Sequence, residues 1–112
     1  QNSSGAERAL KSFIKDYPEH ELASNAHYWL GETYYVRKLF KEAAYAFAEG
    51  YQRFPKGNKA PDYLLKLGMA FGQLGKDTEA CTAFLRLLTS FPNINNRLKG
   101  RAQLQRQRYQ CR

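Results

Sequence analysis

Two histidines and two cysteines are the residues of this chain best suited to metal binding or nucleophilic catalysis. Neither His20 nor His27 has a cysteine, aspartate or glutamate at metal-ligand spacing on a shared helix face, so the sequence predicts no metal site. His27 falls at a packing position of an apolar helical pattern, and we interpret it as a buried histidine. No serine lies in a nucleophile-elbow motif, and the glycines form no phosphate-binding loop. We therefore expect no enzymatic activity and no cofactor.

The two cysteines have no spacing typical of a metal motif or a disulfide framework. Cys81 lies in a helical pattern beside Ala80 and Ala83, which favours a small buried residue. Cys111 is one residue from the end of the sequence. A disulfide between Cys81 and Cys111 would suit an oxidising compartment, but their spacing does not decide whether it forms.

The positive charge is concentrated at the C-terminal end. The net charge is +8, and residues 97–112 hold six Lys and Arg side chains with no acid: Arg97, Lys99, Arg101, Arg106, Arg108 and Arg112. Such a segment could bind a phosphate backbone or anionic lipid. Because Tyr109 is its only aromatic residue, we interpret it as a solvated helix end and expect no nucleic-acid partner, with nucleic-acid binding as the alternative.

No targeting or membrane segment is visible. The chain contains no run of 18 apolar residues, which predicts no membrane insertion. Residues 1–5 lack the basic start and apolar core of a signal peptide, and we expect them to be a linker remnant of a longer protein.

A 37-residue interval organises the rest of the sequence. It relates three aromatic–proline pairs, Tyr17-Pro18, Phe54-Pro55 and Phe91-Pro92. Apolar residues between these pairs recur with helical spacing, which predicts helices over Ala6–Tyr17, Asn25–Arg37, Lys41–Phe54, Pro61–Leu74 and Asp77–Phe91. The sequence thus predicts an all-α repeat domain over residues 6–92, with about two and a half helical hairpins. Residues 93–112 form a basic tail whose weak apolar stripe, Leu98, Ala102 and Leu104, would suit a capping helix.

Two local features indicate how the hairpins pack and begin. Gly31 and Gly68 are related by the same interval and lie inside helical patterns, where glycine costs about 0.5–1 kcal/mol relative to alanine. We therefore expect the backbones of the paired helices to touch at these positions. Asp77 suits a helix N-cap after the turn at Gly75.

The spacing of these residues resembles the tetratricopeptide repeat. The first set that carries the resemblance is His27, Leu30-Gly31, Tyr34, Ala43, Phe47 and Pro55, and the second is Leu64, Leu67-Gly68, Phe71, Ala80, Phe84 and Pro92. His27 stands where that family usually has tryptophan, and the repeat is longer than the usual length of about 34 residues. The resemblance implies helical hairpins in a right-handed superhelix and a protein–protein interaction domain.

A narrower resemblance rests on the runs 25–35, 54–62 and 64–68, together with Ala80-Cys81 and Phe91-Pro92. They look like the C-terminal domain of the cell division coordinator CpoB family, also called the Tol–Pal system protein YbgF family. That resemblance implies a periplasmic protein whose precursor has a signal peptide and whose missing N-terminal coiled coil forms a homotrimer. It implies binding to TolA, a link to the peptidoglycan synthase machinery, and coordination of outer-membrane constriction with septal peptidoglycan synthesis. A tetratricopeptide scaffold of outer-membrane protein assembly is the alternative.

In this family the first helix of each hairpin lines the inner surface, which predicts the binding groove. The residues expected there are Asn25, Tyr28, Glu32, Tyr35, Asp62, Leu65 and Met69. They would make an aromatic, mildly acidic area beside an apolar one, suited to a helix or an extended segment. The Lys and Asn pair that clamps a terminal carboxylate in some members of the family has no counterpart at these positions.

Overall fold

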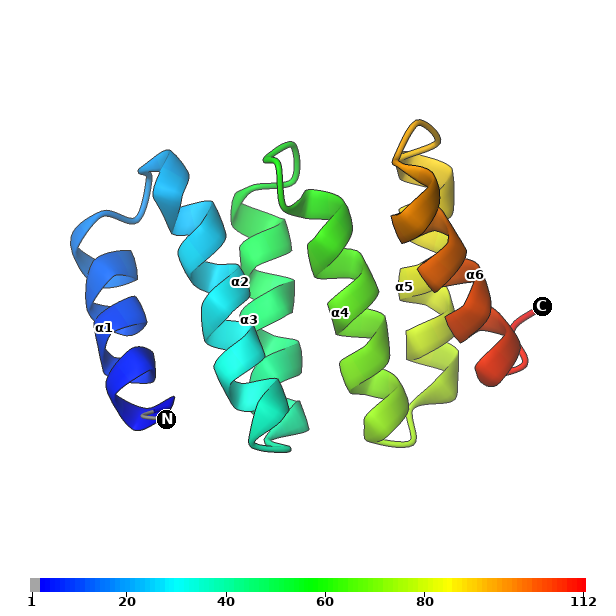
Figure 1. Cartoon of the computed structure of the whole chain (residues 1–112), viewed down its shortest axis with the longest axis horizontal. Helices are drawn as coiled ribbons and strands as arrows, with labels where there is room; N and C mark the ends of the chain where they lie inside the picture. Colours follow the sequence, from blue (N-terminus) through cyan, green and yellow to red (C-terminus); the bar gives the residue numbers. More distant parts are fainter. Residues whose placement is uncertain (1–2) are drawn as a thin grey trace.

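A computed structural model describes residues 3–112, and these residues form six α-helices and no β-strand. The helices are α1 (Ser3–Asp16), α2 (Glu21–Val36), α3 (Phe40–Arg53), α4 (Ala60–Gln73), α5 (Asp77–Ser90) and α6 (Asn96–Arg108). They stand side by side in a row that runs from the N-terminus at one end to the C-terminus at the other (Figure 1). The all-α class predicted from the sequence is therefore confirmed.

Each helix packs against the next one in the chain, so α2 with α3 and α4 with α5 form two helical hairpins. The first helix of each hairpin lies on one side of the molecule, with α3 and α5 behind (Figure 1). In addition, α4 contacts both α2 and α6. The surface formed by α2, α4 and α6 is called the front face below.

Several helix ends differ from the sequence prediction. Helix α2 begins at Glu21 because the side chain of His20 caps it: Nδ1 of His20 accepts a hydrogen bond of 3.0 Å from the backbone N–H of Leu22. Asp77 is the first residue of α5 and not its N-cap. The predicted linker at residues 1–5 is corrected, because residues 3–5 belong to α1. Residues 1–2 lie outside the described part of the chain.

The two helix glycines make room for phenylalanine rings. A Cβ added at Gly31 would overlap the ring of Phe47, and one added at Gly68 would overlap the ring of Phe84. Both phenylalanines are completely buried. The close approach expected at the glycines is therefore present, but a side chain of the second helix fills the space instead of its backbone.

Tyr63 is the largest fully buried side chain, and it links the two hairpins. Its ring occupies the space that a side chain at Gly50 would need, and its hydroxyl donates a hydrogen bond to the backbone carbonyl of Ser24. Its counterpart one interval earlier is Ala26, so periodicity alone did not single it out.

The interpretation of His27 as a buried histidine is confirmed. Its side chain is 1% exposed, and neither ring nitrogen has a hydrogen-bond partner among residues 3–112. Burial lowers the pKa of His27; the charge of Glu49 raises this pKa and that of Arg53 lowers it, both by less than burial does. The counterpart of His27 in the second hairpin is Leu64, which belongs to the core.

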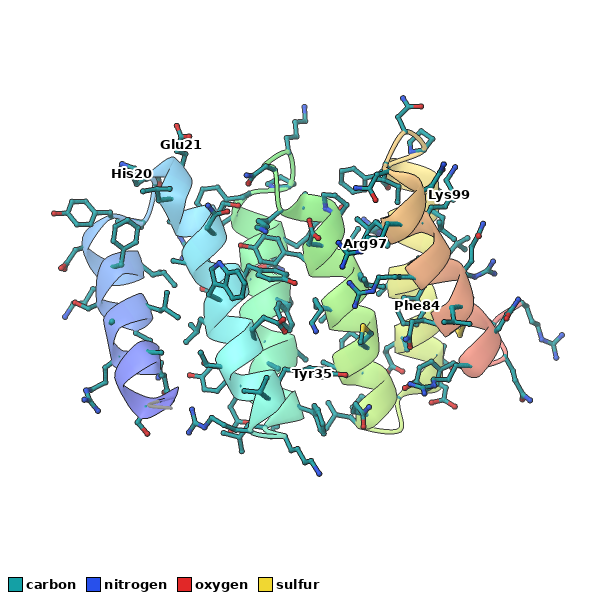
Figure 2. All side chains as sticks on the ribbon, viewed as in Figure 1. His20, Glu21, Tyr35, Phe84, Arg97 and Lys99 are labelled. Carbon is teal, nitrogen blue, oxygen red and sulfur yellow. A yellow bond between two sulfur atoms is a disulfide. The ribbon has the colours of Figure 1, made fainter. Side chains whose placement is uncertain are left out.

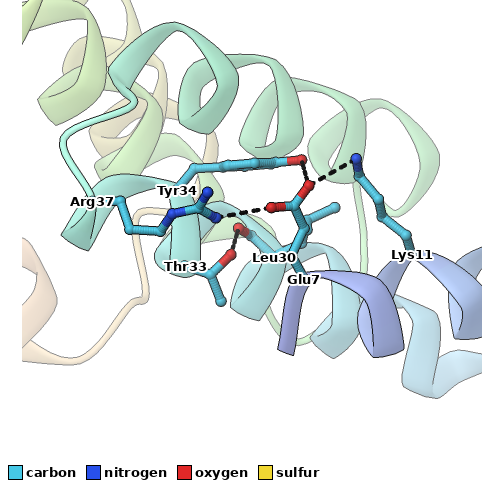
Figure 3. Close-up of polar contacts among 6 residues, drawn as sticks. All are labelled: Glu7, Lys11, Leu30, Thr33, Tyr34 and Arg37. Atoms are coloured by element: carbon cyan, nitrogen blue, oxygen red, sulfur yellow. Dashed lines mark hydrogen bonds and ion pairs between the residues drawn. The ribbon is translucent and has the colours of Figure 1, made fainter. Parts of the chain in front are cut away.

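Glu7 fastens α1 to α2 (Figure 3). Its carboxylate accepts hydrogen bonds from Arg37 at 2.8 Å and from the Tyr34 hydroxyl at 3.1 Å, and it pairs with Lys11 at 2.9 Å. The hydrogen bonds from Arg37 and Lys11 hold the pKa of Glu7 at about 2. Leu10 on the same helix packs against the core cluster that includes Leu30 and Phe47, so α1 is held by both polar and apolar contacts.

Helix α6 is part of the fold at the other end of the row. Leu98 and Ala102 are buried in a core cluster that includes Leu64 and Phe84. A disulfide joins Cys81 of α5 to Cys111, whose Cα atoms lie 5.5 Å apart. Cys81 is half-buried and not fully buried as predicted, and the pairing left open by the sequence is present.

Candidate protein-binding surface

The structure brings the seven predicted groove residues onto two neighbouring helices. Asn25, Tyr28, Glu32 and Tyr35 belong to α2, and Asp62, Leu65 and Met69 belong to α4. Their spacing of three or four residues places each set along one side of its helix. Tyr35 points from α2 toward α4 (Figure 2). Tyr28 and Tyr35 are called the tyrosine pair below.

Tyr28 has one side in the core and another beneath a lysine. Its ring lies 5.9 Å from the ring of Phe47 and 6.1 Å from the ring of Tyr63, measured between centroids. The ammonium group of Lys59 lies 4.7 Å from its centroid, within cation–π range. Burial, with smaller effects from the carboxylates of Glu32 and Asp62, raises the pKa of Tyr28 to about 12. Its hydroxyl is therefore neutral at physiological pH.

Lys66 neutralises the acid on this surface. Its Nζ lies 2.9 Å from Oε1 of Glu32 and 4.3 Å from the ring centroid of Tyr35. Lys66 is 8% exposed, so this ion pair is shielded from water. The mildly acidic character expected for this area is therefore corrected, because Lys59 and Lys66 offset Glu32 and Asp62.

The positions of α4 expected to line the groove are largely covered. Leu65 is 1% exposed and belongs to the core cluster that includes Leu98 and Ala102 of α6. Met69 is half-buried and packs against the same cluster. The expectation that Leu65 offers its side chain to a partner is therefore corrected: it holds the last helix in place. The residues of the predicted set that retain exposed surface are Asn25, Tyr28, Glu32, Tyr35, Asp62 and Met69.

Helix α6 adds positive charge that the groove prediction did not include. The charge of Arg101 acts on the pKa of Tyr28 and that of Arg108 on the pKa of Tyr35, each against the effect of burial. Arg101 and Arg108 are exposed on α6, which packs against α4, and α4 in turn contacts the helix that carries the tyrosine pair. The sequence showed their charge, but only the packing of Leu98 and Ala102 places α6 beside this surface.

The contribution of Lys59 and Lys66 to this surface was also missed. The 37-residue shift relates Lys66 to Trp29 and Lys59 to Leu22. Leu22 and Trp29 are 51% and 52% exposed, whereas Lys66 is buried and pairs with Glu32 of α2. The signal that could have found the lysines is this substitution of two cations for apolar residues at equivalent positions.

A hollow of about 820 Å³ lies away from the predicted groove residues. Its walls come mainly from α1, α2 and α3 and include Ile14, Leu30, Ala44 and Tyr45. Tyr45 is 71% exposed. This hollow is an alternative docking place, and Tyr45 provides a way to test it separately.

The remaining chemistry of the described residues is limited. Residues 3–112 contain no group of three or more His, Cys, Asp or Glu side chains that could hold a metal ion. No helix in that range has the length and apolar character needed to cross a membrane.

Two family models match the sequence, and both describe a tetratricopeptide repeat. One covers residues 1–58 and the other covers residues 62–93. The chain belongs to the tetratricopeptide repeat family. Domains of this family are generally non-catalytic scaffolds for protein–protein interaction. Helix α6 lies outside both matched ranges, and no curated protein matches the chain.

Proposed function

We propose that this tetratricopeptide domain is the partner-binding part of a periplasmic protein of the Tol–Pal system. It binds TolA through the front face and so helps to coordinate outer-membrane constriction with septal peptidoglycan synthesis during cell division. The observation that carries the proposal is the tyrosine pair on α2, inside a run of residues that resembles the CpoB family.

The disulfide supports a location outside the cytoplasm. Cytosolic thiols are kept reduced, whereas the bacterial periplasm is oxidising. A bond between Cys81 and Cys111 therefore fits an envelope protein better than a cytosolic one.

The mechanism that we propose is binding by surface complementarity, with no chemical turnover. Tyrosines often carry a large share of binding energy at protein interfaces, because a rigid ring is buried while the hydroxyl keeps a hydrogen bond. The rings of Tyr28 and Tyr35 are already held by Phe47 and Phe40, with centroids 5.9 Å and 5.0 Å apart. This pre-organisation lowers the entropy lost on binding.

Calorimetric titration with the purified periplasmic part of TolA tests the proposal. The double variant Tyr28→Leu, Tyr35→Leu removes both hydroxyls and aromatic faces but keeps apolar bulk against the core. We expect it to bind at least about tenfold more weakly than the wild type, which corresponds to 1.4 kcal/mol. Circular dichroism should show unchanged helix content.

Tyr45→Leu is the matched control, because it changes an exposed tyrosine at the hollow between α1 and α3. Its affinity for TolA should equal that of the wild type. A loss of binding in the Tyr45 variant alone would move the site to the hollow between α1 and α3. Failure of the wild type to bind TolA would refute the Tol–Pal assignment.

A further inference from the structure

The charged groups around the tyrosine pair come from two helices that are far apart in the sequence. Lys59, the N-cap of α4, and Lys66 within α4 lie against its rings, and Arg101 and Arg108 are exposed on α6, which packs against α4. What appears in the sequence as a basic tail therefore forms one border of the front face.

Three arginines of α6 share one side of the helix. Arg97, Arg101 and Arg108 are four and seven residues apart, which places them within a narrow angular sector. All three are exposed, whereas Leu98 and Ala102 face the core. Arg97 points toward α4, and Lys99 lies on the other side of α6 (Figure 2). Arg97, Arg101 and Arg108 are called the arginine stripe below.

The arginine stripe has no carboxylate of its own. None of the ion pairs found within residues 3–112 involves Arg97, Arg101 or Arg108, and α6 contains no acidic residue. Glu32 is already paired with Lys66 at 2.9 Å. An uncompensated row of cations raises the local concentration of anionic groups and selects for them in a partner.

We propose that the segment bound on the front face is an acidic peptide, whose carboxylates face the arginine stripe while apolar or aromatic side chains contact the tyrosine pair. This inference rests on the proposed function in one respect, namely that the front face binds a protein. It adds the chemical class of the partner segment and assigns a binding role to α6.

The charged groups around the tyrosine pair favour a peptide over a nucleic acid. Glu32 and Asp62 offset Lys59 and Lys66 beside the tyrosine pair, so this part of the surface offers no net positive charge to a continuous phosphate backbone. Lys59 and Lys66 cover the ring faces of Tyr28 and Tyr35 that bases would need for stacking. A peptide can instead place acids only opposite the arginines and apolar residues elsewhere.

Selection of random peptides displayed on phage against the disulfide-bonded chain tests this inference without a presumed partner. We expect the peptides selected by the wild type to be enriched in Asp and Glu together with apolar or aromatic residues. The triple variant Arg97→Gln, Arg101→Gln, Arg108→Gln should lose the acidic enrichment. It should bind a wild-type-selected peptide about tenfold more weakly by fluorescence anisotropy, because each exposed charge contact contributes up to a few-fold.

The control variant changes three exposed cations that lie elsewhere, Lys15→Gln, Lys56→Gln and Arg86→Gln, and so lowers the net charge by the same amount. It should keep both the enrichment and the affinity. Equal loss in the two variants would assign the effect to net charge and overturn the inference.

The remaining outcomes separate the inference from the proposed function. Peptides selected without acidic enrichment would sink the acidic-partner inference but leave a peptide-binding surface in place. Selection of no peptide at all would contradict both. If labelled oligothymidine bound more tightly than the selected peptide, and only the arginine-stripe variant lost that binding, the stripe would belong to a nucleic-acid site and the inference would be wrong.

Discussion

The two hairpins of this domain have the same internal packing, but the side of the first helix that faces outward is partly exposed in one hairpin and covered by α6 in the other. In each, a phenylalanine of the second helix lies on a glycine of the first, Phe47 on Gly31 and Phe84 on Gly68. The adjoining side of α2 keeps Tyr28 and Tyr35 partly exposed, whereas the equivalent side of α4 buries Leu65 beneath α6. One register therefore produces the candidate binding surface in the first hairpin and a surface that packs against α6 in the second.

The difference follows from side-chain type and not from backbone geometry. Tyrosine tolerates a half-exposed position because its hydroxyl remains hydrated, whereas leucine gains most when it is fully buried. The second hairpin also needs α6 because Leu65, Leu64 and Phe84 belong to the same cluster as Leu98 and Ala102. Matched substitutions in the two hairpins can therefore show which positions are equivalent and which are not.

The largest effect should come from the phenylalanines, where the hairpins are alike. Phe47→Ala and Phe84→Ala should each lower the free energy of unfolding by about 3–5 kcal/mol, because both rings are fully buried and leave a cavity. Urea denaturation followed by circular dichroism measures both. A difference of more than about 2 kcal/mol between the two would show that their packing is not equivalent.

The next effect should be confined to the second hairpin. Cys81→Ser with Cys111→Ser removes a cross-link between residues 30 apart in the sequence, which should cost about 3 kcal/mol, because states in which α6 has opened then gain chain entropy. Hydrogen exchange should show faster opening of α6 than in the wild type, with α2 and α3 little changed. Uniform loss of protection across all helices would contradict this local effect.

A smaller and opposite effect should follow when the first hairpin is made to resemble the second at one core position. His27→Leu places leucine where the second hairpin has Leu64, and it removes a buried imidazole with no partner among the described residues. We expect stabilisation by about 1–2 kcal/mol at neutral pH, measured by urea denaturation.

The same variant should also change the response to acid. Burial lowers the pKa of His27 in the folded state, so below its usual value of 6.5 the unfolded chain takes up a proton more readily. The free energy of unfolding of the wild type should therefore fall as the pH drops below 6.5, and the Leu variant should lack this part of the decline. Parallel pH profiles of the two proteins would show that His27 is not the group responsible.

The smallest effect should come from the polar attachment of α1. Glu7→Gln removes the ion pairs with Arg37 and Lys11 and should cost about 1 kcal/mol or less at neutral pH, because both pairs are partly exposed. Since these contacts hold the pKa of Glu7 at about 2, their contribution is present above pH 4.5 and is lost as the pH falls toward 2. Denaturation at low and high salt should give a smaller wild-type advantage at high salt.

Much of the fold could be predicted from the sequence, because the 37-residue interval and helical spacing depend on local patterns that persist in the structure. The start of α2 could not, since it depends on His20, a less usual capping residue. Tyr63 could not be found by periodicity, because Ala26 holds the equivalent position and the space for the ring is made by Gly50 on another helix.

The candidate surface was predictable only in part. The tyrosine pair follows from its place on the first helix of a hairpin. Burial of Leu65 does not, because it depends on where α6 packs, and the charged residues of that helix conceal its weak apolar stripe. The pairing of Lys66 with Glu32 joins two helices, so no pattern within one helix indicates it.

The contact between Tyr109 and Gly72 ties α6 to the second hairpin, so α6 cannot be moved to the first hairpin. Gly72 is the counterpart of Tyr35, and the ring of Tyr109 fills the space beside it while lying on Phe84, with ring centroids 6.3 Å apart. In the second hairpin the aromatic ring at this place thus comes from Tyr109, near the end of the chain, whereas the first hairpin has Tyr35 at the equivalent position of its own first helix. If α6 were grafted behind the first hairpin, the ring of Tyr109 would overlap the side chain of Tyr35, as it would overlap a side chain at Gly72. Helices α4, α5 and α6 must therefore be transferred between scaffolds together.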